Sequence, residues 1–282
     1  MDTMFLKDSG DLVALLKIAD VDDLDILVDY LTDNGKGRVV LSRNVCERLV
    51  SCKATRKYTA ADREVIASEI LLFGGNTIAN MFRGGKGVSY QELVGDVGGN
   101  VKANFSKGAS AATIEEAILQ KLFDSALGNM KADERRQAMD DMETFKWSGA
   151  EMAQKWAWGG AAYYGMSYIV ANAMARTIVG RGLPVMVNVV AMRGAAAFLG
   201  PIGLAISGIW SIADLASPAF RVTVPCVVQI AYIRQKALRR ALENSCPACN
   251  QVNPIDASFC AHCGQRMPEK AKPSTAVVAR AF

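Results

Sequence analysis

Four cysteines near the C-terminus have the type and spacing to bind a metal ion. Two Cys-x-x-Cys pairs, Cys246/Cys249 and Cys260/Cys263, are separated by ten residues. Each pair can direct two thiolates at one ion, and four thiolates close a tetrahedral Zn²⁺ site. A module of about 25 residues cannot bury a core, so metal binding supplies its folding energy. We therefore expect one structural Zn²⁺ per chain, held in a zinc ribbon over residues 244–268.

Catalytic constellations are not expected in this chain. His262 is its only histidine and lies between two of the four cysteines, which have the more regular ligand spacing, so we expect it to be exposed. No Ser-His or Cys-His pair can then form elsewhere, and no carboxylates are paired in a recognisable pattern. We predict no catalytic residue, no small-molecule substrate and no enzyme. Cys46, Cys52 and Cys226 are expected to be reduced residues in or near the core.

An uncharged run of twenty residues, 194–213, is compatible with a membrane helix or a buried helix. Its length matches a hydrocarbon layer of about 30 Å. However, Pro201 predicts a helix start inside the run, and a helix from there to about residue 216 is roughly 24 Å long, which is too short to cross a bilayer. We favour a buried core helix, with membrane insertion as the alternative. A second uncharged run covers residues 156–175, and Pro225 is predicted to open the last helix.

Hydrophobic periodicity and capping residues predict helices throughout the remaining chain. Asp20, Asp22 and Thr59 are candidate N-caps, and Thr113 with Glu116 has the pattern of a capping box. The glycine pair at residues 98–99 predicts a break between elements. None of these segments has the alternating pattern of a strand, so helices are expected here too.

The predicted fold class is all-α, with a small C-terminal zinc ribbon. The composition changes abruptly near residue 150, where charged residues become rare. The expected parts are an acidic N-terminal helical module (1–33), a helical middle domain (34–149), a Gly/Ala-rich apolar helical bundle that is a candidate membrane-inserting hairpin (150–243), the zinc ribbon (244–268) and a disordered tail (269–282).

The net charge of +4 is too small to indicate nucleic-acid binding, but it is unevenly distributed. Residues 1–33 contain nine Asp and two Lys, whereas residues 219–282 contain nine Lys or Arg and three acidic residues. We favour two solvated faces of opposite charge. Contact between the two segments, within one chain or between chains, is the alternative.

Three stretches of the chain read DLVALLKIADVDDLDILVDYLT, EILLFGGNTIANMFRGGKGVSYQELVGDV and GPIGLAISGIWSIADLASPAFRVTVPCVVQIAYIR. In this order they resemble the YaaW family of bacterial proteins. The resemblance implies a mostly helical bacterial protein and carries over no activity and no catalytic residues. Some members bear a ubiquinol-cytochrome c chaperone-like label. The zinc ribbon is an addition to the family pattern and suggests a docking module.

Together these observations predict a non-enzymatic, membrane-associated assembly, chaperone-like or stress-related interaction protein. Its partner is expected to be a protein that contacts the zinc ribbon or the acidic N-terminus, with a membrane surface as a further candidate. The alternative is a regulated membrane-inserting helical effector that forms pores or permeabilises membranes. The first residues lack the pattern of a signal peptide, so the bacterial cytoplasm, with association at the inner membrane as a candidate, is the expected location.

Overall fold

The computed structural model describes residues 6, 10–75, 87–133, 135–136, 160–179, 219–243, 246–249, 253 and 257–267. Over these residues the regular structure is helical, apart from one β-bridge between Phe259 and Arg266. The all-α prediction is therefore confirmed. The helices are α2 (Leu12–Lys17), α3 (Val21–Thr32), α4 (Arg43–Thr55), α5 (Ala60–Gly74), α7 (Tyr90–Asn100), α8 (Ala111–Gly128), α11 (Gly160–Val179) and α13 (Phe220–Glu243).

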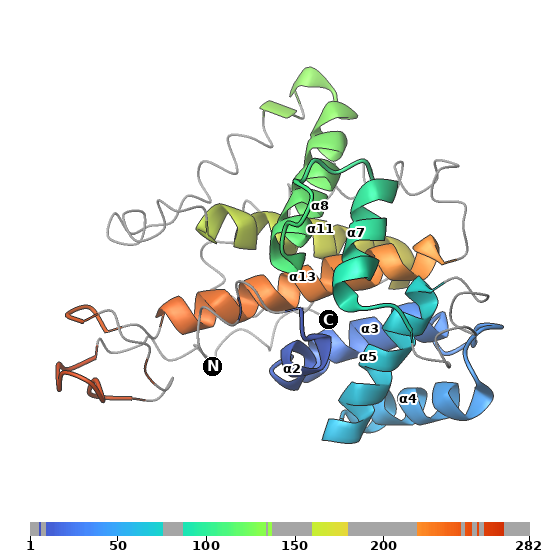
Figure 1. Cartoon of the computed structure of the whole chain (residues 1–282), viewed down its shortest axis with the longest axis horizontal. Coiled ribbons are helices and arrows are strands. Elements are labelled where there is room, and N and C mark those ends of the chain that lie inside the picture. Colours follow the sequence, from blue (N-terminus) through green and yellow to red (C-terminus); the bar gives the residue numbers. More distant parts are fainter. Residues whose placement is uncertain are drawn as a thin grey trace, which may run out of the picture.

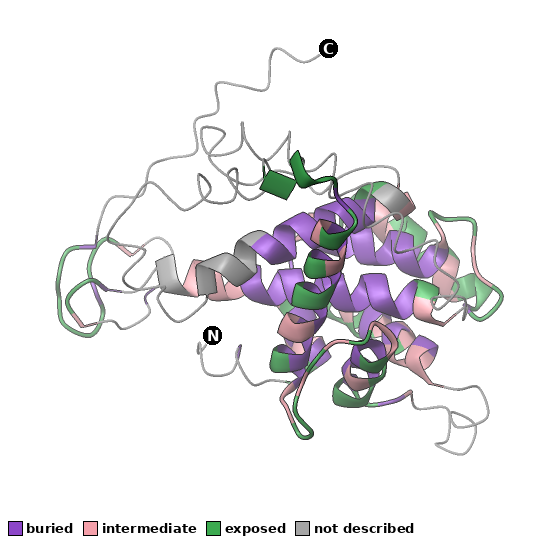
Figure 2. Ribbon diagram, turned by 90° about the horizontal axis from the view of Figure 1, so that it is seen from above, coloured by how far each residue is buried: buried purple, intermediate pink, exposed green. Residues whose placement is uncertain are grey.

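Helix α13 lies at the centre of the helical body (Figure 1). Its most extensive contact is with α11, and it also packs against α3, α8, α5, α7 and α2. Residues 222–236 are all buried, so this part of the helix is covered on every side. Figure 2 shows the buried positions concentrated in the middle of the helical body. An all-round covered helix is a core element, which explains why the other helices are arranged around it.

One continuous apolar core joins the N-terminal, middle and C-terminal helices. Leu27 of α3, Ile118 of α8, Val170 of α11 and Val227 of α13 belong to it, and each is 0% exposed. The domain boundaries expected near residues 33 and 149 stay a prediction. In the described residues, the buried side chains on both sides of these boundaries form the same core.

The helix starts confirm one predicted cap and correct another. Thr59 caps α5, because its Oγ1 accepts a hydrogen bond from the Asp62 N–H (3.2 Å) and the Asp62 carboxylate accepts one from the Thr59 N–H (2.8 Å). The predicted capping box at Thr113 is wrong. Helix α8 begins at Ala111, and the Ser110 hydroxyl accepts a hydrogen bond from the Thr113 N–H at 3.3 Å. The sequence offers a good cap one turn earlier, and alanines extend the helix back to it.

Two predicted helix boundaries are also wrong. Helix α7 continues through Gly98 and Gly99, and Gly98 packs so closely that an added Cβ would lie 2.5 Å from the Phe105 ring. The glycine therefore serves close packing and does not end the helix. Pro225 lies inside α13 rather than at its start. It removes one backbone hydrogen bond near the beginning of the helix, and burial of the following residues outweighs that loss.

The acidic N-terminal segment contacts the basic end of α13 directly. Asp20 forms ion pairs with Arg240 at 2.7 Å and with Lys236 at 2.6 Å. Asp23 forms another with Lys236 at 2.9 Å. The favoured prediction of two solvated faces is wrong for these residues, and the alternative of contact within the chain is confirmed. The charges meet because α3 and α13 pack against each other.

A fully buried ion pair joins α13 to α8. The Arg234 and Glu115 side chains are each 1% exposed, and their hydrogen bonds measure 2.7 Å from Nε to Oε2 and 2.9 Å from Nη2 to Oε1. The Tyr90 hydroxyl of α7 donates a third bond to Glu115 at 2.7 Å, and Arg234 Nη1 donates to the Leu6 carbonyl at 2.8 Å. The pair therefore ties three helices and the N-terminal segment together inside the core.

Several predicted features lie outside the described residues. They are residues 194–213 with the helix expected from Pro201, residues 156–159 of the second uncharged run, and the tail at 269–282. From residue 160 the second run forms α11, where residues 166–175 are buried. Among the described helices, none combines the length and apolar character needed to cross a membrane. Membrane insertion of this protein stays a prediction. An alkaline carbonate wash of bacterial membranes tests it, because only an inserted chain is retained in the membrane pellet.

Candidate metal centre

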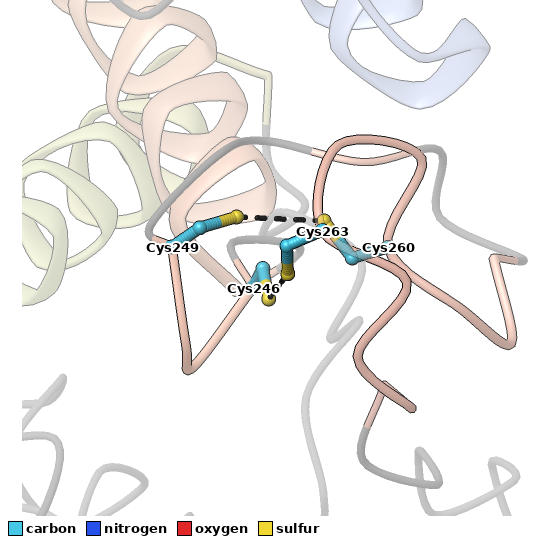
Figure 3. Close-up of side chains that lie close together, drawn as sticks. All are labelled: Cys246, Cys249, Cys260 and Cys263. Atoms are coloured by element: carbon cyan, nitrogen blue, oxygen red, sulfur yellow. Dashed lines mark hydrogen bonds between the residues drawn. The ribbon is translucent and has the colours of Figure 1, made fainter.

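The four predicted cysteine ligands converge in space (Figure 3). The sulfur atoms of Cys246, Cys249, Cys260 and Cys263 all lie within 4.8 Å of one another. The sulfurs of Cys246 and Cys263 are 3.5 Å apart, as are those of Cys249 and Cys260. A tetrahedral ion with metal–sulfur bonds of about 2.3 Å places its ligands about 3.8 Å apart. The arrangement therefore has the size and donor set of a metal site.

A short hairpin positions the second cysteine pair. The Cys260 N–H donates to the Gln265 carbonyl (2.8 Å), and the Met267 N–H donates to the Ser258 carbonyl (2.9 Å). Gly264 then turns the chain, with its N–H bonded to the Cys260 carbonyl at 2.9 Å. Its φ of +71° lies in the left-handed region that favours glycine, so the glycine after Cys263 is a requirement of the turn.

Backbone and side-chain donors surround the sulfurs. The Ala248 N–H points to the Cys246 sulfur, and the His262 N–H points to the Cys260 sulfur, each at 3.4 Å. These contacts come from the Cys-x-x-Cys turns themselves, so the local sequence is sufficient to produce them. They hold the thiolates in the directions that a shared ion requires.

Asn253 supports the site and was not anticipated from the sequence. Its side chain is buried, with Nδ2 3.5 Å from the Cys260 sulfur and Oδ1 accepting a hydrogen bond from the Ala261 N–H at 2.8 Å. The available signal was its position before Pro254, because Asn-Pro is a common start of a turn. Asn253 thus contacts both the Cys260 sulfur and the backbone of the hairpin.

Hydrogen bonding favours the thiolate form at two of the ligands. Burial raises the pKa of the Cys260 thiol, but the backbone N–H groups of Cys263 and His262 outweigh this effect and lower it to about 6. Burial also raises the pKa of the Cys246 thiol, but hydrogen bonds, including one from the Cys249 N–H, outweigh burial and give a net lowering of this pKa. Deprotonated sulfur is the form that binds metal ions.

Among the described residues of the module, the buried cluster consists of Cys246, Cys260 and Met267, and it is separate from the core of the helical body. His262 is exposed, as predicted. Cys46 and Cys52 are partly buried and Cys226 is buried, in agreement with their expected place in or near the core. A cluster of three side chains cannot stabilise the hairpin by apolar burial alone.

Sequence comparison relates this chain to bacterial proteins. A UPF0174 protein of Helicobacter pylori strain J99 is 34% identical over 180 residues, which cover 61% of this chain and 71% of the relative. A UPF0174 protein of H. pylori strain 26695 is 33% identical over 182 residues, covering 61% and 87% of the two chains. The chain belongs to the UPF0174 family. The UPF0174 protein YaaW of Escherichia coli K12 is 26% identical over 247 residues, or 83% of this chain and 97% of YaaW, which confirms the predicted resemblance.

Other comparisons add no function to this family assignment. No family model matches the chain, and no solved structure matches it. The names of the UPF0174 relatives state no activity, metal or partner.

Proposed function

We propose that this UPF0174 protein is a non-enzymatic interaction protein that docks a protein partner through a structural zinc ribbon. The observation that carries the proposal is the closed set of four cysteine sulfurs at the end of α13. Four thiolates are the donor set of a structural zinc site, because they leave no coordination position for water or substrate. Zinc bound there folds a surface and does not perform chemistry.

Zinc is the principal source of stability for this module. The buried cluster formed by its described residues contains three side chains, so apolar burial within this cluster contributes little. Binding of zinc to four thiolates in small modules supplies enough free energy to fold them. The hairpin and its turns therefore depend on the metal, whereas the helical body has its own large core.

The ribbon presents an aromatic side chain that suits protein recognition. Phe259 is 61% exposed, although it lies directly before a metal ligand in the hairpin. Residues 261–266 are exposed as well, so the outer side of the hairpin is accessible. Exposed aromatic side chains on a fixed backbone are typical anchors of protein interfaces. The expected partner surface carries an apolar pocket for Phe259.

Metal analysis tests the zinc site. We expect one zinc per chain in the purified protein and less than about one tenth of that in Cys249→Ser, because three remaining thiolates bind zinc far more weakly. Cys46→Ser is the matched control, since Cys46 lies in the helical body. Far-ultraviolet circular dichroism should show the helices intact in both variants. A full zinc complement in Cys249→Ser would show that the four-cysteine assignment is wrong.

Affinity capture from the native bacterium tests docking. We expect a partner that is captured by the native protein and by Cys46→Ser, and that is lost with Phe259→Ser. The Phe259→Ser protein should still contain one zinc per chain, which separates loss of the anchor from loss of the metal. If Phe259→Ser captures the same proteins in the same amounts as the native protein, the ribbon surface is not the docking site.

A further inference from the structure

Three segments of the chain meet at the end of the helical body opposite the ribbon. The connection between α3 and α4 lies there beside the last turn of α11, because Asn34 Nδ2 donates to the Ile178 carbonyl at 3.2 Å. The beginning of α13 lies at the same end of the helical body (Figure 1). Figure 1 shows these three segments at the right of the view.

The α3–α4 connection exposes two adjacent valines, in what we call the valine turn (residues 38–41). The turn is closed by a hydrogen bond from the Leu41 N–H to the Arg38 carbonyl at 3.1 Å. Val39 is 106% exposed and Val40 is 69% exposed, whereas Leu41 is buried and anchors the turn. Turn centres usually carry Gly, Pro, Asn, Asp or Ser, so two β-branched apolar residues there contradict the local rule. Such contradictions are expected at functional sites.

The backbone holds the valine turn in place. Gly37 has φ +87°, and its N–H donates to the Thr32 carbonyl at the end of α3 at 2.7 Å. The Arg38 guanidinium donates from Nε to the Tyr30 carbonyl at 3.1 Å. The valines are therefore presented on a fixed support, and little conformational entropy is lost when they become covered.

The segments that meet at this end of the molecule carry several exposed cations. Lys36 and Arg43 flank the turn, and Arg176 and Arg221 lie in the last turn of α11 and the first turn of α13. All four are exposed. Among the described residues of these segments, the acidic groups are Asp33 and Glu47, which form ion pairs with Arg38 and Arg43. With Arg38 counted, five cations face two carboxylates, so the surface is positively charged.

We propose that this end of the helical body docks on an anionic lipid bilayer, with Val39 and Val40 entering the boundary between headgroups and acyl chains. Apolar side chains surrounded by Lys and Arg are the combination that binds such a surface, because apolar burial and attraction to anionic lipid act together. Helix α11 ends and helix α13 begins at this end of the helical body (Figure 1). The sequence between them includes the uncharged run at residues 194–213. This surface is separate from the ribbon, so the proposal goes beyond partner docking.

Vesicle sedimentation with the full chain tests the proposal. Vesicles of phosphatidylcholine alone are compared with vesicles that also contain phosphatidylglycerol. We expect binding to the anionic vesicles only, with weaker binding when salt rises from about 50 mM to about 500 mM. Val39→Ser/Val40→Ser should weaken binding about tenfold or more, because apolar burial is lost while serine suits the turn. Lys36→Glu/Arg43→Glu should weaken it about 30-fold, since each cation near an anionic surface contributes about fivefold.

Matched controls separate docking from general effects. Lys57→Glu/Lys121→Glu makes the same change in net charge on exposed residues away from this end and should bind almost as well as the native protein. Cys249→Ser should bind normally, which distinguishes failure of this proposal from failure of the zinc assignment. Each variant is checked by its thermal melting.

Four outcomes would overturn the proposal: no binding by the native protein, equal binding to neutral vesicles, unchanged binding by the valine variant, or equal weakening by Lys57→Glu/Lys121→Glu. If the valine variant instead abolishes self-association or capture of a protein partner while vesicle binding persists, the valine turn is a protein interface.

Discussion

Replacement of Arg234 by methionine provides the strongest test of how the helical body is held together. Arg234→Met keeps much of the aliphatic volume of the side chain and removes its charge. The change leaves the Glu115 carboxylate, which is 1% exposed, with the Tyr90 hydroxyl as its remaining hydrogen bond from this network. It also removes the donor to the Leu6 carbonyl.

The size of the effect follows from burial. Removing one partner of a buried ion pair costs about 3–5 kcal/mol, because the other charge remains desolvated without compensation. We therefore expect the free energy of unfolding to fall by about that amount in Arg234→Met. The double variant Arg234→Met/Glu115→Leu removes the stranded charge as well, so it should be more stable than the single variant by about 2 kcal/mol.

Urea unfolding of the zinc-loaded protein, followed by circular dichroism, measures these differences. Arg43→Met is the control, because its ion pair with Glu47 is exposed, with 90% and 63% of the two side chains accessible. It should cost no more than about 0.5 kcal/mol. A loss below about 1 kcal/mol in Arg234→Met, or simple additivity of the two core changes, would refute the role assigned to the buried pair.

Two further predictions concern packing and pH. Gly98→Ala should lower the free energy of unfolding by about 1–3 kcal/mol, because the added Cβ would press on the Phe105 ring. Gly99→Ala should raise the free energy of unfolding by up to about 1 kcal/mol, because there is open space at this position. Equal effects of the two changes in urea unfolding would contradict the packing argument. Burial raises the pKa of Asp20, but hydrogen bonds from Arg240 and a second cation outweigh it and lower the pKa from 3.8 to about 2. A depressed pKa stabilises the fold above pH about 4, and this contribution disappears as the pH falls to about 2. Asp20→Asn should therefore reduce stability at neutral pH and make the loss between pH 4 and 2 shallower; an unchanged acid limb would show that Asp20 does not contribute.

The features predicted correctly from the sequence are those that depend on nearby residues. The Cys-x-x-Cys turns direct their sulfurs through contacts within each turn, so spacing alone identified the four cysteines that converge. Thr59 was correctly predicted as an N-cap, and its partner Asp62 lies only three positions further along the chain. In both cases the local sequence contains the whole interaction, and the tertiary fold adds little to it.

The features that were missed depend on residues far apart in the chain. Arg234 and Glu115 are 119 positions apart, and nothing near either residue marks the other as its partner. In the sequence, the cations at the end of α13 fit a solvated helix terminus as well as an ion-pair site. Only the tertiary fold shows that Asp20 and Asp23 lie beside them. Gly98 resembles a helix break in the sequence, but the constraint that requires glycine at this position is the Phe105 ring on the following loop. Local propensity gave way to tertiary packing at each of these positions.

The length of α13 sets a distance between the two surfaces to which we assign partners. The helix begins at the end that carries the valine turn and finishes before Cys246, and its 24 residues span about 36 Å. Its middle is enclosed by the other helices, so it cannot bend freely. A protein anchored by Phe259 would therefore be held roughly one bilayer core thickness away from a lipid surface at the other end. In that arrangement the helix contributes at most about 36 Å to the distance between the partner and the membrane.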